Sequence, residues 1–438
     1  MRYRQILLLL IVFCLLTGCS VTTVDQMYQL PKRSDDYNNL QSAIDSAMSG
    51  LSYCAPLTGE NRQTIQICDL DGDGEQEYLL FAKGNQDKPL RILVFSETDG
   101  VFSNVATVEC TGSAFDQVEY IDMDGRDGVE VIVGCQLSDQ VIRSASVYTF
   151  ADGTLRQTGV ASYTKYMTTD LDGDGCGELF VLRPDVEDAH NGMAELYMMS
   201  GDTLKRINGV PMSQPTDRLK RMIVGKLDGG KSAVYAASAV GDTSLVTDVY
   251  TLLDGKLKNV SLSGEANTSI RTMRNFYVYA DDLDNDSIVE LPSLISMKSL
   301  PGMMSGDMHH LIRWFAMTPG GEEVDKMYTY HNFLGGWYLR LDSQWAQRIT
   351  VLHREQKTEF YLWSEDFNTS EKLMTVYAFT GNNREEMGHS EGRFVLHKTE
   401  SVVYAAYLEN EAKQNGITQE NIVYSFRLIQ QDWKTGET

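Results

Sequence analysis

A short acidic segment recurs along the chain at a near-constant spacing, and this repeat constrains the fold more than any other feature. The copies are DLDGDGEQE from Asp69, DMDGRDGVE from Asp122, DLDGDGCGE from Asp170, a degenerate KLDGGKSAV from Lys226, and DLDNDSIVE from Asp282. Consecutive copies begin about fifty residues apart, and a period of about 20 to 50 residues is typical of repeat architectures. The chain is therefore expected to be built from repeated units.

A second sequence pattern recurs with the same period. Each acidic segment is followed by alternating strand formers and a glycine turn: ILVFSETDGVF around Gly100, SVYTFADGTL around Gly153, ELYMMSGDTL around Gly201, DVYTLLDGKL around Gly255, and a looser copy past Gly320. Asp-Gly or Gly-Asp between such runs is a strong hairpin signal. Each unit then contains four short strands, as in QTIQIC, EYLLFA, LRILVF and VFSNVATVE.

These units predict a mainly β fold. Four antiparallel strands over about 50 residues are typical of a propeller blade, and one blade cannot bury both faces of its sheet alone. The sequence predicts a propeller-like array of about five four-stranded blades over residues 38–332, including a short amphipathic helix at its start. A small α+β domain is expected over 333–438. Whether the blades close into a ring is left open.

The first acidic segment has the chemistry of a cation site. Asp69, Asp71, Asp73 and Glu77 occupy positions 1, 3, 5 and 9 of the loop, and alternate residues of a tight turn can point to one centre. An all-oxygen, flexible, multi-carboxylate site suits Ca²⁺ better than Mg²⁺ or Zn²⁺. The loop is not an EF-hand, because that motif needs a Glu at position 12, where Leu80 stands. The alternative is an Asp-rich turn held only by backbone hydrogen bonds.

The loops resemble the FG-GAP/VCBS repeats of integrin-α-like propellers and bacterial surface proteins. The resemblance covers about residues 63–331; the Phe-Gly and Gly-Ala-Pro segments that name the family are not visible, so the loops carry it almost alone. It implies calcium binding copy by copy. The implied ligands are Asp69, Asp71, Asp73 and Glu77; Asp122, Asp124 and Glu130; Asp170, Asp172, Asp174 and Glu178; and Asp282, Asp284, Asp286 and Glu290.

Two copies depart from the ligand pattern. The second has Arg126 at position 5, where Asp127 is a possible substitute, and the fourth has Lys226 at position 1 and Val234 at position 9. The fourth is therefore expected to be empty. The segment from GWYLRLDSQW to the last helical stretch is similar in pattern to a PsbP-like α+β domain of some clostridial surface proteins.

The first residues have the plan of an export signal. Arg2 and Arg4 precede an apolar run that is too short for a permanent membrane helix, and Leu16-Thr17-Gly18-Cys19 resembles the bacterial lipobox. The resemblance implies a signal peptide over 1–18, acylation of Cys19 and a polar tether over 19–37. The expected location is the outer face of the bacterial cytoplasmic membrane, with the Gram-negative outer membrane as the alternative. One or two disulfides among the five remaining cysteines stay open.

Composition and the absence of certain motifs limit the classes of function that this chain can have. The formal net charge of -23 argues against nucleic-acid binding, and the sequence lacks GxSxG, HExxH, P-loop and GxGxxG-after-strand patterns. We therefore expect a non-enzymatic, calcium-stabilised surface lipoprotein that binds an extracellular protein or glycan. The alternatives are a polysaccharide- or peptidoglycan-acting enzyme with its site at the propeller mouth, and a structural subunit of an envelope assembly.

Overall fold

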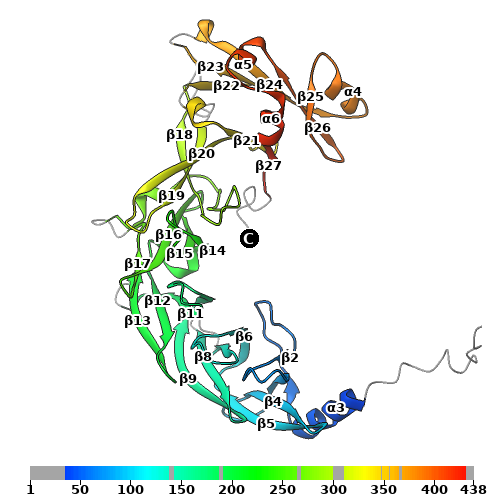
Figure 1. The fold of residues 1–438 in the computed structure, drawn as a ribbon, viewed down its shortest axis with the longest axis vertical. Coiled ribbons are helices and arrows are strands. Elements are labelled where there is room, and N and C mark those ends of the chain that lie inside the picture. The colour runs from blue at the N-terminus through cyan, green and yellow to red at the C-terminus, as the bar shows by residue number, and fades with distance from the viewer. Residues whose placement is uncertain are drawn as a thin grey trace, which may run out of the picture.

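The computed structural model describes residues 35–137, 143–186, 191–263, 268–298, 310–346, 348–354, 356–364 and 367–430. The predicted signal peptide, Cys19 and most of the tether lie outside the described residues. Antiparallel strands make up most of the described chain and form six consecutive sheets arranged along an arc (Figure 1). The prediction of a mainly β chain made of four-stranded antiparallel units is confirmed.

The strands follow one another in chain order within most sheets. The first sheet contains β1 (Ser52–Tyr53), β2 (Ile65–Cys68), β3 (Glu77–Lys83), β4 (Leu90–Thr98) and β5 (Val101–Cys110). The second contains β6 (Ala114–Ile121), β7 (Glu130–Gln136), β8 (Arg143–Ala151) and β9 (Thr154–Tyr163). The third contains β10 (Lys165–Thr169), β11 (Glu178–Pro184), β12 (Gly192–Met199) and β13 (Leu204–Pro211). The fourth contains β14 (Leu219–Lys226), β15 (Ser232–Val240), β16 (Ser244–Leu253) and β17 (Lys256–Asn259).

The last two sheets include the C-terminal part of the chain. The fifth contains β18 (Leu291–Ser296), β19 (His310–Met317), β20 (Glu323–Asn332), β21 (Trp337–Leu341) and β27 (Phe426–Leu428). The sixth contains β22 (Ile349–Arg354), β23 (Lys357–Leu362), β24 (Glu371–Thr380), β25 (Phe394–Lys398) and β26 (Val402–Leu408). The helices are α3 (Asp35–Ala47), α4 (Arg384–His389), α5 (Asn410–Gln414) and α6 (Gln419–Ser425), with 3₁₀ turns η1 (Thr216–Arg218), η2 (Ile270–Thr272), η4 (Ser343–Trp345) and η5 (Phe367–Thr369). No helix of the described residues is long and apolar enough to cross a membrane.

Alternation along the central strands places an apolar layer on each side of a sheet. In β3, Leu79 and Phe81 pack toward the second sheet, whereas Leu80 and Ala82 pack against α3. Successive side chains of a strand point to opposite faces, so a sheet that is covered on both sides needs the continuous apolar runs seen in EYLLFA and ELFVLRP. Separate hydrophobic clusters fill the spaces between consecutive sheets.

The sheets form an open stack whose two ends are covered. Helix α3 packs Ile44 onto the outer face of the first sheet, and the sixth sheet with α5 and α6 covers the fifth. In Figure 1 the first and fifth sheets lie at separate places along the arc. Terminal elements that cover an exposed repeat face are what a repeat array needs when it does not close on itself.

The Asp-Gly turns behave as the sequence predicts. Asp99 and Gly100 both have positive φ, 53° and 80°, and the same holds at Asp152-Gly153 and Asp254-Gly255. Two consecutive positive φ values define the type I′ turn, whose twist matches that of the flanking strands. These turns set the register between β4 and β5, between β8 and β9, and between β16 and β17.

The boundary expected at residue 332 falls inside a hairpin. Strand β20 ends at Asn332 and pairs with β21, with Asn332 opposite Trp337. Strand β21 then pairs with β27 near the C-terminal end, with Trp337 opposite Leu428. The C-terminal segment therefore shares the fifth sheet with the repeat array, besides contributing the whole sixth sheet.

Candidate functional site

The first four acidic loops connect neighbouring antiparallel strands, β2 to β3, β6 to β7, β10 to β11 and β14 to β15, whereas the fifth directly precedes β18. Two residues of each complete loop anchor it in the core. Position 2 is a buried apolar residue such as Leu171, and position 9 is a buried glutamate such as Glu178 in every loop except the fourth. The Oε2 atom of Glu178 accepts a hydrogen bond from the backbone N–H of Leu171 at 2.6 Å. The same bond joins Glu77 to Leu70, Glu130 to Met123 and Glu290 to Leu283. These four loops are thus closed by a carboxylate that accepts from a backbone amide, whereas the fourth copy has Val234 at this position.

The loops bring carboxylates together. In the third loop, ligand atoms from Asp170, Asp172, Asp174 and Glu178 all lie within 4.8 Å of one another. Three carboxylates meet in each of the other groups: Asp69, Asp71 and Glu77; Asp122, Asp124 and Glu130; and Asp282, Asp284 and Glu290. Asp73 and Asp286 lie outside these groups, and each accepts a bond from a backbone N–H two residues further along.

The aspartates also hold the loop backbone. In the third loop, Asp170 accepts N–H bonds from Gly173 at 2.6 Å and from Gly175 at 3.1 Å. Gly173 and Gly175 have positive φ, 85° and 95°, which glycine adopts at little cost. The Asp-rich turn and the convergent carboxylates therefore occur together, and the turn places the acids around one point.

The buried glutamates are costly to keep charged. Burial, opposed in part by the Leu171 N–H and reinforced by the aspartates around it, raises the pKa of Glu178 to about 7. The pKa of Glu290 is likewise raised to about 7, again mainly by burial. The Oε1 atom of Glu290 has no hydrogen-bond partner and its residue is 0% exposed. A buried carboxylate oxygen without a partner carries a desolvation penalty that a bound cation would offset.

In each of the two substituted loops an aspartate pairs with a Lys or Arg of the protein itself. In the second loop, Arg126 Nε donates to Asp124 Oδ2 at 2.7 Å, and the same guanidinium pairs with Asp202 of the third sheet at 2.9 Å. In the fourth loop, Lys326 of β20 pairs with Asp228 at 2.7 Å. Among the described residues, no Lys or Arg forms an ion pair with the acids of the first, third or fifth loop.

Acidic loops of consecutive units contact each other through the backbone. Val129 of the second loop donates to the carbonyl of Leu70 in the first at 3.1 Å, and Gly177 of the third donates to Asp122 of the second at 2.7 Å. Val289 of the fifth loop donates to Lys226 of the fourth at 3.0 Å. The donor stands at position 8 each time. The loops therefore lie at joints between units.

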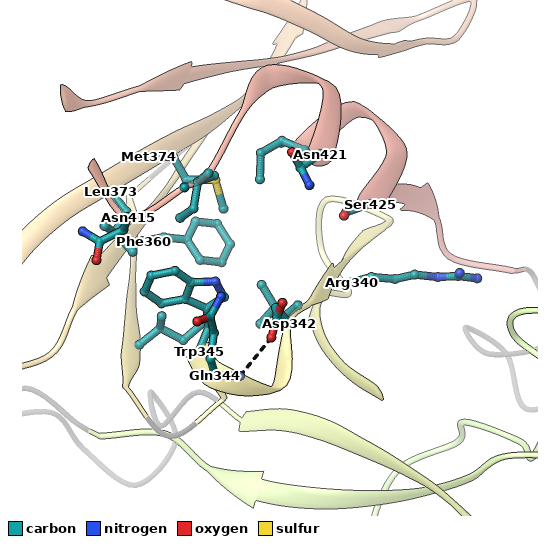
Figure 2. Close-up of a pocket in the computed structure, with 15 residues that line it drawn as sticks. Arg340, Asp342, Gln344, Trp345, Phe360, Leu373, Met374, Asn415, Asn421 and Ser425 are labelled. Carbon is teal, nitrogen blue, oxygen red and sulfur yellow. Dashed lines mark hydrogen bonds between the residues drawn. The ribbon is translucent and has the colours of Figure 1, made fainter. Parts of the chain in front are cut away.

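A separate pocket lies between the fifth and sixth sheets and α6. Its floor is apolar, with Trp345, Phe360 and Met374 at the centre (Figure 2). Amide side chains, including Gln344 and Asn421, stand at its rim. The cavity encloses about 140 Å³. Asp342, the one carboxylate among its lining residues, accepts the Gln344 N–H at 3.1 Å.

Sequence reasoning and structure coincide on the acidic loops and differ in what surrounds them. The sequence identifies the acids, and the structure groups most of them. The backbone-closing role of the position-9 glutamate and the pairing of Asp228 with Lys326 were missed. The role of the glutamate could have been found from the sequence, because a glutamate stands at position 9 in all four loops that begin with aspartate. The Asp228–Lys326 pair has no local sequence signal, because the two residues are far apart in sequence.

Comparisons with known proteins give little further information. No protein-family model and no curated protein sequence matches the chain. A rhamnogalacturonan lyase of Bacillus licheniformis shows 12% identity over 71% of this chain and 76% of its own, with a TM-score of 0.30. The β-propeller domain of the trilobed protease of Pyrococcus furiosus shows 12% identity over 72% and 89%, with a TM-score of 0.27. A protein from Lactobacillus plantarum shows 10% identity over 73% and 86%, with a TM-score of 0.28. Likenesses at these scores carry no argument about this chain's activity.

Proposed function

We propose that this chain is a calcium-stabilised, lipid-anchored binding protein at the bacterial cell surface, with propeller-like repeats of the FG-GAP/VCBS kind. The lipid is attached at Cys19, and the chain lies on the outer face of the cytoplasmic membrane. Its partner is an extracellular protein or glycan. The N-terminal sequence supports the location, and the repeats support the scaffold.

The observation that carries the proposal is the difference between complete and substituted loops. Where Arg126 or Lys326 brings a positive charge, the aspartates have an ion-pair partner. In the third loop, four carboxylates converge with no such partner among the described residues. In the fifth, a buried oxygen of Glu290 is unpaired. Like charges a few ångströms apart and partly buried repel strongly, so the complete loops need a cation from outside.

Calcium fits these loops best. The donor set consists of oxygens, the glycine-rich turn is flexible, and several carboxylates are available, whereas Mg²⁺ demands near-octahedral geometry. Asp170, Asp172, Asp174 and Glu178 would hold the ion in the third loop. Affinities of extracellular calcium modules are about 10⁻⁴ to 10⁻³ M. Bound at the joints between units, the ion would fix one sheet relative to the next.

The apolar pocket is the candidate ligand site. Its floor offers apolar contacts and its rim offers amide donors and acceptors, the combination found in many small-ligand sites. Glycoside hydrolysis requires two carboxylates, and the lining residues include one. The enzyme alternative places its site at the mouth of a propeller, and the described sheets form an open arc (Figure 1). Binding is therefore favoured over hydrolysis.

The test is thermal unfolding of the full chain after removal of metal by a chelator, followed by addition of Ca²⁺ or Mg²⁺. We expect the melting temperature to rise with Ca²⁺ well above its rise with Mg²⁺. Asp172→Asn should reduce that rise. Asp87→Asn, at an exposed position in the β3–β4 turn, is the matched control and should leave it unchanged. Equal responses to both ions, or none, would contradict the calcium assignment.

A further inference from the structure

Two cysteines of neighbouring sheets meet in the core between the first and second sheets. Cys110 ends β5 and Cys135 lies in β7, and both belong to the hydrophobic cluster that joins the two sheets. The Cys110 sulfur lies 3.4 Å from the Tyr148 hydroxyl, and the Cys110 and Cys135 thiols are near enough to each other that each shifts the pKa of the other. Cys54, Cys68 and Cys176 are also free thiols.

The chain path explains why the two thiols meet. After Cys110 the chain crosses to the second sheet through Gly112, whose φ is +142°. A Cβ placed on Gly112 would lie 3.3 Å both from the Cβ of Cys135 and from a methyl carbon of Leu90. Leu90 is the β-sheet partner of Cys110. The crossing segment therefore passes directly over Cys135 and holds the end of β5 beside it.

We propose that Cys110 and Cys135 form a disulfide that joins the first and second sheets in the exported protein. The crossing segment and the shared cluster place the two residues beside each other, and a disulfide needs Cα atoms no more than about 7 Å apart. Exported proteins fold where disulfides persist. The bridge would close a loop of about 25 residues across a sheet interface, which restricts the unfolded chain.

The oxidation balances with an external disulfide. Each thiol gives up one proton and one electron as the S–S bond forms. The disulfide of the oxidant breaks and takes up both protons and both electrons as two thiols. At the cell surface the oxidant would be a thiol–disulfide oxidoreductase; in the test it is oxidised glutathione. Cys110 and Cys135 are 6% and 4% exposed, so the bond must form during folding, before the core closes.

The experiment refolds the reduced full chain in a buffer of oxidised and reduced glutathione, then unfolds it and alkylates the remaining thiols. We expect two fewer alkyl groups by intact mass than in the fully reduced chain, and one peptide that links Cys110 to Cys135. Cys135→Ser should abolish the linked peptide. Cys176→Ser is the matched control and should retain it. The measurement is repeated with Ca²⁺ and with chelator, because the disulfide is expected in both and does not depend on the metal assignment.

Either of two results would overturn the proposal. One is complete alkylation of Cys110 and Cys135 in chains whose circular dichroism shows a refolded β structure. The other is a linked peptide that pairs Cys110 or Cys135 with Cys54, which also packs against this cluster. Because Cys135→Ser could impair folding of the core, the same peptide analysis of the unsubstituted chain decides the question by itself.

Discussion

At the scale of single residues, the charge of each acidic loop is balanced in one of two ways. Arg126 and Lys326 are cations supplied by the protein, and they pair with Asp124 and Asp228. Asp228 holds the pKa of Lys326 above its usual value, so this lysine stays charged at neutral pH. Among the described residues, no Lys or Arg forms an ion pair with an acid of a complete loop, although the charges of Asp286 and Glu290 also raise the pKa of Lys326. We infer that the loops with an ion pair are fixed joints and that the complete loops are metal-dependent ones.

Replacing Lys326 tests the fixed cation. Lys326→Met should lower the free energy of unfolding by about 1 kcal/mol, because a half-buried Asp228 loses its partner. Adding Asp228→Asn should restore part of the loss. Urea unfolding of the two single variants and the double variant gives the coupling energy. Additive effects of the two changes would show that the pair contributes nothing.

A buried histidine gives a pH prediction. Burial lowers the pKa of His331 from 6.5 to about 3. The unfolded chain therefore takes up this proton at a higher pH than the folded chain, and stability falls as the pH drops from about 6.5 toward 3. His331→Phe keeps a ring beside Tyr338 and removes the titration. As the pH falls, the melting temperature of His331→Phe should rise relative to that of the unsubstituted chain. A difference between the two melting temperatures that does not change with pH would contradict the lowered pKa of His331.

At the scale of elements, the acidic loop is a strand connection anchored at both ends in the core. Leu171 at position 2 is 1% exposed and packs between the third and fourth sheets. Leu171→Ala should lower the free energy of unfolding by about 3 kcal/mol, since it removes a buried side chain and leaves a cavity. Val160→Ala, on an exposed site of β9 that is 52% exposed, should change it by less than about 0.5 kcal/mol. Chemical unfolding measures both.

The sequence predicts these elements because their signals are local. Asp-Gly at residues 99–100 and 152–153 defines a turn without reference to the rest of the chain, and the loop acids and glycines lie within nine residues. Long-range contacts have no such signal. Nothing near Asp228 indicates Lys326, and nothing in β27 indicates that Leu428 pairs with Trp337. Hydrophobic periodicity predicts strands, but it does not state which face meets which neighbour.

At the scale of the whole molecule, the sheets form an open arc whose ends are covered rather than joined (Figure 1). The helix α3 is therefore a cap, and Ile44 is its central contact with Leu80 and Phe95 of the first sheet. The interface between two sheets contributes stability only while both sheets are folded.

Loosening the cap should expose the first sheet. Ile44→Asp buries a charge against apolar side chains, which is strongly unfavourable, so α3 should detach. We expect a lower melting temperature and stronger fluorescence of a dye that binds exposed apolar surface. Ser42→Asp, on the exposed side of the same helix, is the control. An unchanged Ile44→Asp chain would show that α3 does not cover the sheet.

The most direct test of the account is the number of calcium ions bound by the full chain, measured by equilibrium dialysis and metal analysis at saturating Ca²⁺. The account predicts three ions, one for each complete loop, and two after Asp172→Asn. It also predicts that Asp124→Asn, in the loop that carries Arg126, leaves the number unchanged. No bound calcium, or the loss of an ion with Asp124→Asn, would contradict the division into metal-held and self-neutralised joints.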